Sequence, residues 1–125
     1  MKFKKRQRKN PQDLNSAGKY YAIPVNTGKI SLDDMASRIA RSSSLTRGDV
    51  LNVLTNLIDE IPDYLKDGKS VQLGELGTLR MSFSSEGTEK PEILNADKIR
   101  NIKVVFIPGM KLKHELRNTT FTELK

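Results

Sequence analysis

The sequence has 125 residues, 36% hydrophobic and 30% charged, with a net charge of +7, a pI near 9.7 and a mean hydropathy of −0.53. This size and composition fit one domain with a modest extension better than two full domains, and they exclude collagen, low complexity and wholesale disorder. No apolar run approaches the about 18 residues of a membrane span, and the basic start lacks a signal-peptide stretch, so we expect a soluble intracellular chain.

The positive charge is concentrated near the N-terminus. Residues 1–30 carry eight basic residues and one acidic residue, whereas residues 31–76 have a net charge of −3 and residues 77–125 a net charge of +3. An excess of positive charge favours the binding of polyanions, such as nucleic acid or an anionic membrane surface. A solvated stretch that only raises solubility is the alternative interpretation.

The first 30 residues combine strand and loop signals. A polar stretch over residues 10–18 is typical of a loop, and the Tyr-Tyr-Ala-Ile run at residues 20–23 indicates a short strand. We expect a loose hairpin or an extended strand packed on the main domain.

Two helices are predicted next, each opened by a capping box. Ser31 with Asp34, and Thr46 with Asp49, have the spacing at which the N-cap side chain and the third side chain each bond the other's backbone N–H. Three serines at residues 42–44 end the first helix. The second helix has a wide apolar face, made of Val50, Leu51, Val53, Leu54, Leu57, Ile58, Ile61, Tyr64 and Leu65.

Pro62 interrupts the pattern of the second helix. Proline has no N–H for the carbonyl of Ile58, so the pattern predicts a kink or an early end, at a cost of about 3 kcal/mol in an undistorted helix. Asp67 and Gly68 then provide a helix stop signal.

A small sheet is expected after the helices. The sequence of residues 71–73 predicts a short strand. In residues 79–83 and 102–107 every second residue is apolar, so each of these predicted strands has one apolar face. Arg80, Ser82 and Lys103 fall on the opposite face. The polar loop between these strands, residues 84–97, has a net charge of −3. Residues 110–117 predict a short helix, and residues 119–122 a terminal strand.

The apolar helix and strand faces offer more surface than one small subunit covers, which predicts self-association. The alternative is a monomer whose terminal extensions act as a lid. The expected dimer interface consists of Val50, Val53, Leu54, Leu57, Ile58 and Ile61.

The order of the elements and several motifs carry a family resemblance. LTRGDV at residues 45–50 opens the second helix, LKDGKSVQL at residues 65–73 and GTL at 77–79 follow, and FIPGMKLK at 106–113 forms the closing strand and helix. Together they resemble the bacterial histone-like HU and integration-host-factor family over about residues 29–117. The N-terminal part resembles an HU-related subgroup with an extension.

The resemblance implies an α+β, HU/IHF-like fold: two N-terminal helices, a small antiparallel β-sheet and a short C-terminal helix in an intertwined dimer, with an added N-terminal strand or hairpin. It divides the chain into a basic N-terminal extension (residues 1–28), an HU-like DNA-binding domain (29–117) and a C-terminal strand or tail (118–125). Proteins of this family hold duplex DNA in a saddle, and two β-arms reach round the minor groove, where an arm-tip proline wedges between base steps.

The sequence departs from this family in three places. The glycines of the turn at residues 74–79 are spaced differently, and Met110 stands where the family usually has a lysine. The basic arm tip is replaced by Glu89-Lys90-Pro91-Glu92, which would repel phosphate. We therefore interpret Pro91 as a turn element rather than a wedge.

DNA contact is accordingly assigned to cations outside the arm. The N-terminal run is expected to be a flexible contact, and its segment Lys9-Asn10-Pro11-Gln12 resembles the missing arm tip in its letters. Phosphate contact is the expected role of these cations, with solvated surface cations as the alternative. The predicted DNA-binding residues are Lys4, Lys5, Arg6, Arg8, Lys9, Arg80, Lys103, Lys111 and Lys113.

Catalysis is not expected. With no cysteine and His114 as the single histidine, thiol nucleophiles, disulfides and multi-histidine metal sites are excluded. The neighbouring acids Asp33-Asp34 and Asp59-Glu60 diverge by about 100° on a helix, and no glycine-rich phosphate loop is present. We expect no metal, no cofactor, no small-molecule substrate and no membrane partner.

The sequence thus predicts an architectural, largely non-sequence-specific DNA-binding homodimer, cytoplasmic and nucleoid-associated, whose partners are double-stranded DNA and itself. A protein-interaction dimer of the same fold with weak or lost duplex binding is the alternative, consistent with the acidic loop and Met110. Single-strand or RNA binding through the basic N-terminus, Tyr20 and Tyr21 is less favoured, since no regular aromatic platform is present. One of these tyrosines is expected to pack inward, because adjacent strand residues point to opposite faces.

Overall fold

The computed structural model describes residues 1–13, 15 and 17–125, which form two compact units. One unit combines residues 1–30 with residues 116–125, and the other consists of residues 31–115. No helix in these described ranges is long and apolar enough to cross a membrane. Residues 118–125, expected from the sequence as a segment of their own, share the first unit with the N-terminal residues.

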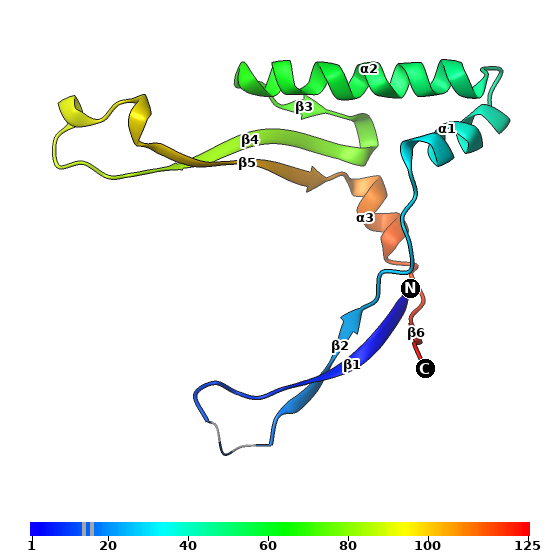
Figure 1. The fold of residues 1–125 in the computed structure, drawn as a ribbon, viewed down its shortest axis with the longest axis horizontal. Coiled ribbons are helices and arrows are strands. Elements are labelled where there is room, and N and C mark those ends of the chain that lie inside the picture. Colours follow the sequence, from blue (N-terminus) through cyan, green and yellow to red (C-terminus); the bar gives the residue numbers. More distant parts are fainter. Residues whose placement is uncertain (14, 16) are drawn as a thin grey trace. The chain divides into compact units, whose positions relative to one another are not determined.

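The first unit is built on a three-stranded sheet in the order β2-β1-β6 (Figure 1). Strand β1 (Lys2–Arg8) pairs antiparallel with β2 (Lys19–Pro24) and parallel with β6 (Thr122–Glu123). The main-chain bonds from Thr122 N to Met1 O (3.0 Å) and from Leu124 N to Phe3 O (2.8 Å) hold the C-terminal end to β1. The expected hairpin is confirmed. The expectation of a flexible basic run is wrong, because β1 is the central strand, paired on both edges.

The second unit opens with helices α1 (Leu32–Arg41) and α2 (Arg47–Lys66). Both capping boxes are formed: Ser31 Oγ accepts from Asp34 N at 3.1 Å, and Thr46 Oγ1 accepts from Asp49 N at 3.1 Å. Each box satisfies two N–H groups that a helix start leaves unpaired.

Helix α2 continues through Pro62 to Lys66, so the predicted early end does not occur. Pro62 is exposed, and only one internal hydrogen bond is lost where water can replace it. The helix ends where the stop signal predicted, with Asp67 as its C-cap and Gly68 at φ 80°.

The second sheet has the order β3-β4-β5, all antiparallel. Its strands are β3 (Val71–Gln72), β4 (Gly77–Ser85) and β5 (Ile99–Pro108), and the 3₁₀ turn η1 (Gly74–Leu76) lies between β3 and β4. Helix α3 (Met110–Leu116) follows β5. Two glycines permit close backbone contacts here: a Cβ on Gly77 would collide with Ile107 O, and one on Gly109 with Glu75 O. The altered glycine spacing is therefore compatible with a defined turn.

Strands β4 and β5 run beyond the predicted residues into an arm (Figure 1). The tip contains two 3₁₀ turns, η2 (Pro91–Ile93) and η3 (Ala96–Lys98). The strand register shifts between Ser82 and Ser84, and across from this irregularity Asn101 adopts φ 56° and donates to Ser84 Oγ at 3.1 Å. An amide side chain tolerates this left-handed conformation better than most.

The core that a single chain forms is small. Among the described residues, the buried apolar side chains are Ala36, Val50 and Leu65, and all three belong to the second unit, where α2 contacts α1, β3 and β4. Larger apolar side chains such as Leu57 and Phe106 remain exposed. The second unit therefore leaves much of its apolar surface open to solvent.

Candidate nucleic-acid interface

Strands β4 and β5 place two of the predicted cations on one face. Ser82 is directly opposite Lys103 in the register, and Arg80 lies two residues before Ser82, so all three point to the same side. Val105, opposite Arg80, shares this side. The expected grouping of Arg80, Ser82 and Lys103 is confirmed, although part of their face is apolar.

The reverse face of these strands is apolar throughout its central rows. Leu79 lies opposite Phe106, and Met81 opposite Val104. Val104 and Phe106 are still 60% and 44% exposed. A single chain thus segregates the cations from an apolar face that it does not cover itself.

The two cations of α3 have different surroundings. Lys111 Nζ lies 3.7 Å from Glu75 Oε2 of η1, and both side chains are largely exposed. This ion pair partly offsets the charge of Lys111, with little effect on stability because water screens it. Lys113 sits one turn into the helix, and its backbone N–H bonds Gly109 O at 3.1 Å.

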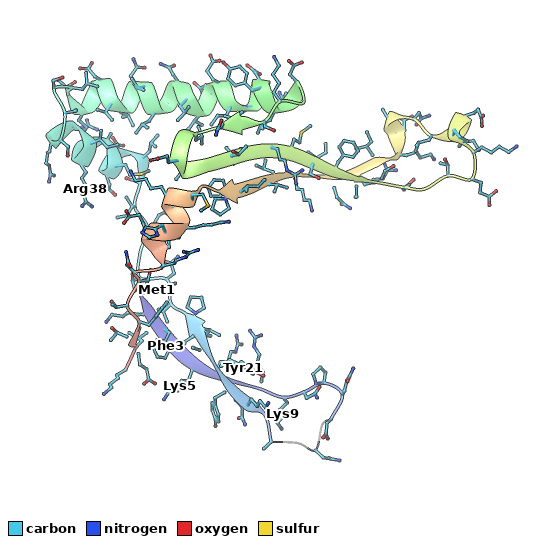
Figure 2. All side chains as sticks on the ribbon, turned by 180° about the vertical axis from the view of Figure 1, so that it is seen from behind. Met1, Phe3, Lys5, Lys9, Tyr21 and Arg38 are labelled. Carbon is cyan, nitrogen blue, oxygen red and sulfur yellow. The ribbon has the colours of Figure 1, made fainter. Side chains whose placement is uncertain are left out.

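The first unit divides the N-terminal cations between two faces of its sheet. Alternation along β1 sets Lys4, Arg6 and Arg8 on one side and Lys5 on the other. Lys5 Nζ lies 3.4 Å from Glu123 Oε1 on β6, a second sign that these two residues share the other side. Lys9 follows the end of β1 (Figure 2). The predicted run is therefore not one patch.

Two further cations, which were not predicted from the sequence as binding residues, lie on the same side of the sheet as Lys4. Lys2 precedes Lys4 by two residues, and Lys19 is paired with Arg8 across the hairpin. The alternation Lys2-Lys4-Arg6-Arg8 was available in the sequence as a period of two. Lys19 could be added only from the hairpin register, which the loop length and the strand pairing determine.

The tyrosines lie on opposite faces but neither is packed inward. Tyr21 is paired with Arg6 and Tyr20 with Gln7, and their exposed fractions are 48% and 69%. The expectation that one of them packs inward is wrong, because none of the described residues of this unit is buried.

The arm tip is acidic and internally braced. Arg100 Nη2 lies 3.3 Å from Glu86 Oε1, and Glu86 N donates to Lys98 O at 2.9 Å. Pro91 occupies the first position of η2, in agreement with its interpretation as a turn element. The segment Lys9-Asn10-Pro11-Gln12 also forms a turn, in which Asn10 Oδ1 accepts from Gln12 N.

The predicted interface residues of α2 are mostly uncovered. Val53, Leu57 and Ile58 are 60%, 42% and 52% exposed, and Leu54 and Ile61 are half-buried. Val50 differs, since it is already buried within the chain.

The acidic pair at the start of α1 has structural partners. Asp34 completes the capping box, and Asp33 pairs with Arg47 at the start of α2. In the described ranges, no three residues of the histidine, cysteine, aspartate and glutamate types are grouped as a metal site would need. Asp34 thus has a capping role, and Asp33 links the start of α1 to the start of α2.

One family model matches the chain over residues 1–123: HU-HIG, described as an HU domain fused to wHTH, Ig or glycine-rich motif. The chain belongs to the HU-HIG family. The match includes β1, β2 and β6, so the N-terminal sheet is part of the HU-HIG pattern and not an addition outside it. A search of curated protein sequences gave no match.

Two solved structures share the fold of this HU-HIG chain. A protein from Bacteroides vulgatus, described as a bacterial DNA-binding protein, has 17% sequence identity and a TM-score of 0.63, with 98% of this chain and 48% of that chain covered. HU from Anabaena, crystallised with DNA, has 15% identity and a TM-score of 0.56, with 72% of this chain and 100% of that chain covered. The HU-HIG chain spans about half the length of the Bacteroides protein.

Proposed function

We propose that the chain is an architectural DNA-binding protein that binds the duplex mainly through backbone phosphates, with little sequence preference. The observation that carries this proposal is the common face of Arg80 and Lys103 in a member of a family defined by an HU domain. The neighbour crystallised with DNA, Anabaena HU, supports the same role. Cations on a strand face suit phosphate contact, which positions a duplex without reading its bases. Association with the nucleoid follows from this role.

The binding form is proposed to be a homodimer. The α2 face at Val53, Leu57 and Ile58 and the β5 residues Val104 and Phe106 are exposed in one chain. Covering such surface contributes about 25 cal/mol per Å² of apolar area, which favours a second copy. Two copies would also double the number of phosphate contacts.

Duplex titration at several salt concentrations tests this function. The slope of log K against log salt is about −0.9 per phosphate neutralised. Because Arg80→Gln with Lys103→Gln removes four cations from a homodimer, we expect the slope to become shallower by up to about 3.6. A matched control, Lys66→Gln with Lys69→Gln, removes the same charge at the end of α2 and should change the slope much less. An equal change of the salt slope in both double variants would show that duplex binding depends only on the net charge of the protein.

The acidic arm favours one alternative, a protein-interaction dimer of the same fold. Residues 84–97 carry a net charge of −3, and Ile93 and Leu94 at the tip are 53% and 50% exposed. Under this alternative no duplex binding is measurable even at low salt. Straight duplex, bent duplex and four-way DNA belong in the same titration, since a preference for bent forms would support the architectural role.

A further inference from the structure

The sheet of the first unit has one strongly cationic face. We define the basic face as the side of this sheet that contains Lys4, and the register assigns to it Lys2, Lys4, Arg6, Arg8, Lys19, Tyr21, Ile23 and Thr122. Among the described residues of β1, β2 and β6, this face has five cations and no carboxylate. The other side carries Lys5, whose charge is offset by Glu123. The net positive charge of these strands is therefore directed to one side of the sheet.

Tyr21 lies within the row of cations on the basic face. It is opposite Arg6, and the next pairs on the same side are Arg8 with Lys19 and Lys4 with Ile23. Tyr21 as a whole residue is 48% exposed. Base stacking requires an accessible aromatic ring, and single strands have base faces to offer, whereas the bases of a duplex already stack on each other.

An open hollow lies beside this ring at the loop end of the hairpin. Its volume is about 650 Å³, and its lining includes Tyr21, Arg8, Lys9 and Lys19 together with the loop residues Asn10 and Asp13. Pockets for small organic groups have volumes of about 300–1,000 Å³, so the hollow has room for a nucleobase and its sugar. Among the described lining residues, the three cations outnumber the carboxylate of Asp13, so the net positive charge of the hollow suits the attached phosphates.

We propose that the basic face is a binding site for single-stranded nucleic acid, separate from the duplex-binding face of β4 and β5. The backbone follows β1, where the cations of Lys4, Arg6 and Arg8 repeat about every 7 Å, and one base stacks on Tyr21. Tyr20 and Lys5 are the sequence neighbours of Tyr21 and Arg6. They take no part because they lie on the other side of the sheet. This inference goes beyond the proposed duplex binding and stands on different residues.

Adjacent residues on opposite faces provide matched variants for the test. Binding of the full chain to a fluorescent oligothymidylate, which forms no duplex, is measured by anisotropy at several salt concentrations. We expect Tyr21→Leu to weaken binding roughly tenfold, the effect of losing one base–aromatic stack, and Tyr20→Leu to change it less than about twofold. Arg6→Gln should make the salt slope shallower by about 0.7, and Lys5→Gln should leave it unchanged.

Further measurements separate stacking from misfolding and from duplex binding. Tyr21→Phe retains the ring and should restore the affinity that Tyr21→Leu loses, which assigns the effect to the ring and not to the hydroxyl. Titration of a duplex with Tyr21→Leu should give the affinity of the parent chain. Equal effects of Tyr20→Leu and Tyr21→Leu, or absent oligothymidylate binding at low salt, would overturn the single-strand site, whatever the duplex result. An equal loss of duplex and single-strand binding in Tyr21→Leu would overturn it in favour of a general polyanion surface.

Discussion

At the scale of single residues, chain alternation decides which charges act together. Arg6 and Lys5 are neighbours in sequence, yet Arg6 lies on the basic face and Lys5 pairs with Glu123 on the other. The same holds for Tyr21 and Tyr20. A count of basic residues therefore overstates the charge available to one ligand, because half of a strand always points away from it.

The capping carboxylate of α1 gives a pH-dependent contribution to stability. The backbone N–H of Ser31, and then its side chain, hold the pKa of Asp34 below its ordinary value of 3.8. A lowered folded-state pKa means that the charged form stabilises the fold above that ordinary value, and that this contribution is lost as the pH falls through the lowered pKa.

We therefore expect Asp34→Asn to lower the free energy of unfolding at neutral pH and to have progressively less effect below about pH 4. Urea unfolding followed by helical circular dichroism, at neutral pH and under acid conditions, measures the difference between the two proteins. A difference that stays constant over this range would contradict the role of the charged carboxylate. Asp33→Asn serves as the control, since Asp33 pairs with Arg47 and not with the helix cap.

At the scale of elements, the arm combines a strand pair suited to reach outward with a tip unsuited to phosphate. Its register irregularity at Ser82 and Ser84 and the positive φ of Asn101 shape the strands, and the Glu86–Arg100 ion pair braces the base of the tip. Bulges of this kind change the local twist of a strand pair. Charge at Glu89 and Glu92 then opposes insertion into a groove.

We expect Pro91→Ala to leave any protein-induced DNA bend unchanged. Pro91 begins the short turn η2 and is flanked by acidic residues, so replacing it has only local conformational effects. Energy transfer between dyes at the two duplex ends measures the bend, with Arg80→Gln as a variant that lowers affinity. Loss of the bend at unchanged affinity would show that the arm tip inserts between base steps after all.

At the scale of the whole molecule, the exposed apolar surface is the main energetic problem. With Ala36, Val50 and Leu65 as its buried apolar residues among those described, one chain has a very small core for its length. The apolar face of α2 is left largely without cover, with Val53, Leu57 and Ile58 exposed. Dimerisation through this face would supply the missing core.

We expect Leu57→Asp to abolish the dimer at micromolar concentration, since a carboxylate in an apolar interface lacks a partner and costs several kcal/mol. Sedimentation velocity of the parent chain and the variant measures this directly. Asn56→Asp, which adds the same charge at the adjacent polar position, should remain dimeric. A parent chain that sediments as a monomer would contradict the dimer, whereas a dimeric Leu57→Asp would contradict the assignment of the interface to this face of α2.

The sequence by itself determined the features that depend on neighbours within a few residues. Both capping boxes, the stop at Gly68 and the alternation that unites Arg80 with Lys103 all appear in the structure as predicted. Their hydrogen bonds and periodicities span no more than a helical turn or a strand, so local residue types are sufficient to specify them. The family resemblance, read from such motifs, is confirmed by the HU-HIG match.

Only the tertiary structure decided how distant segments combine. The pairing of Lys2 with Thr122 makes β1 a central strand instead of a flexible run, and the hairpin register places Lys19 and Tyr21 on the basic face. The N-terminal ammonium bonds Thr120 O at 2.7 Å across 119 residues of sequence. No local pattern encodes such a pairing, because a register shift of one residue would leave every propensity unchanged and move each side chain to the other face.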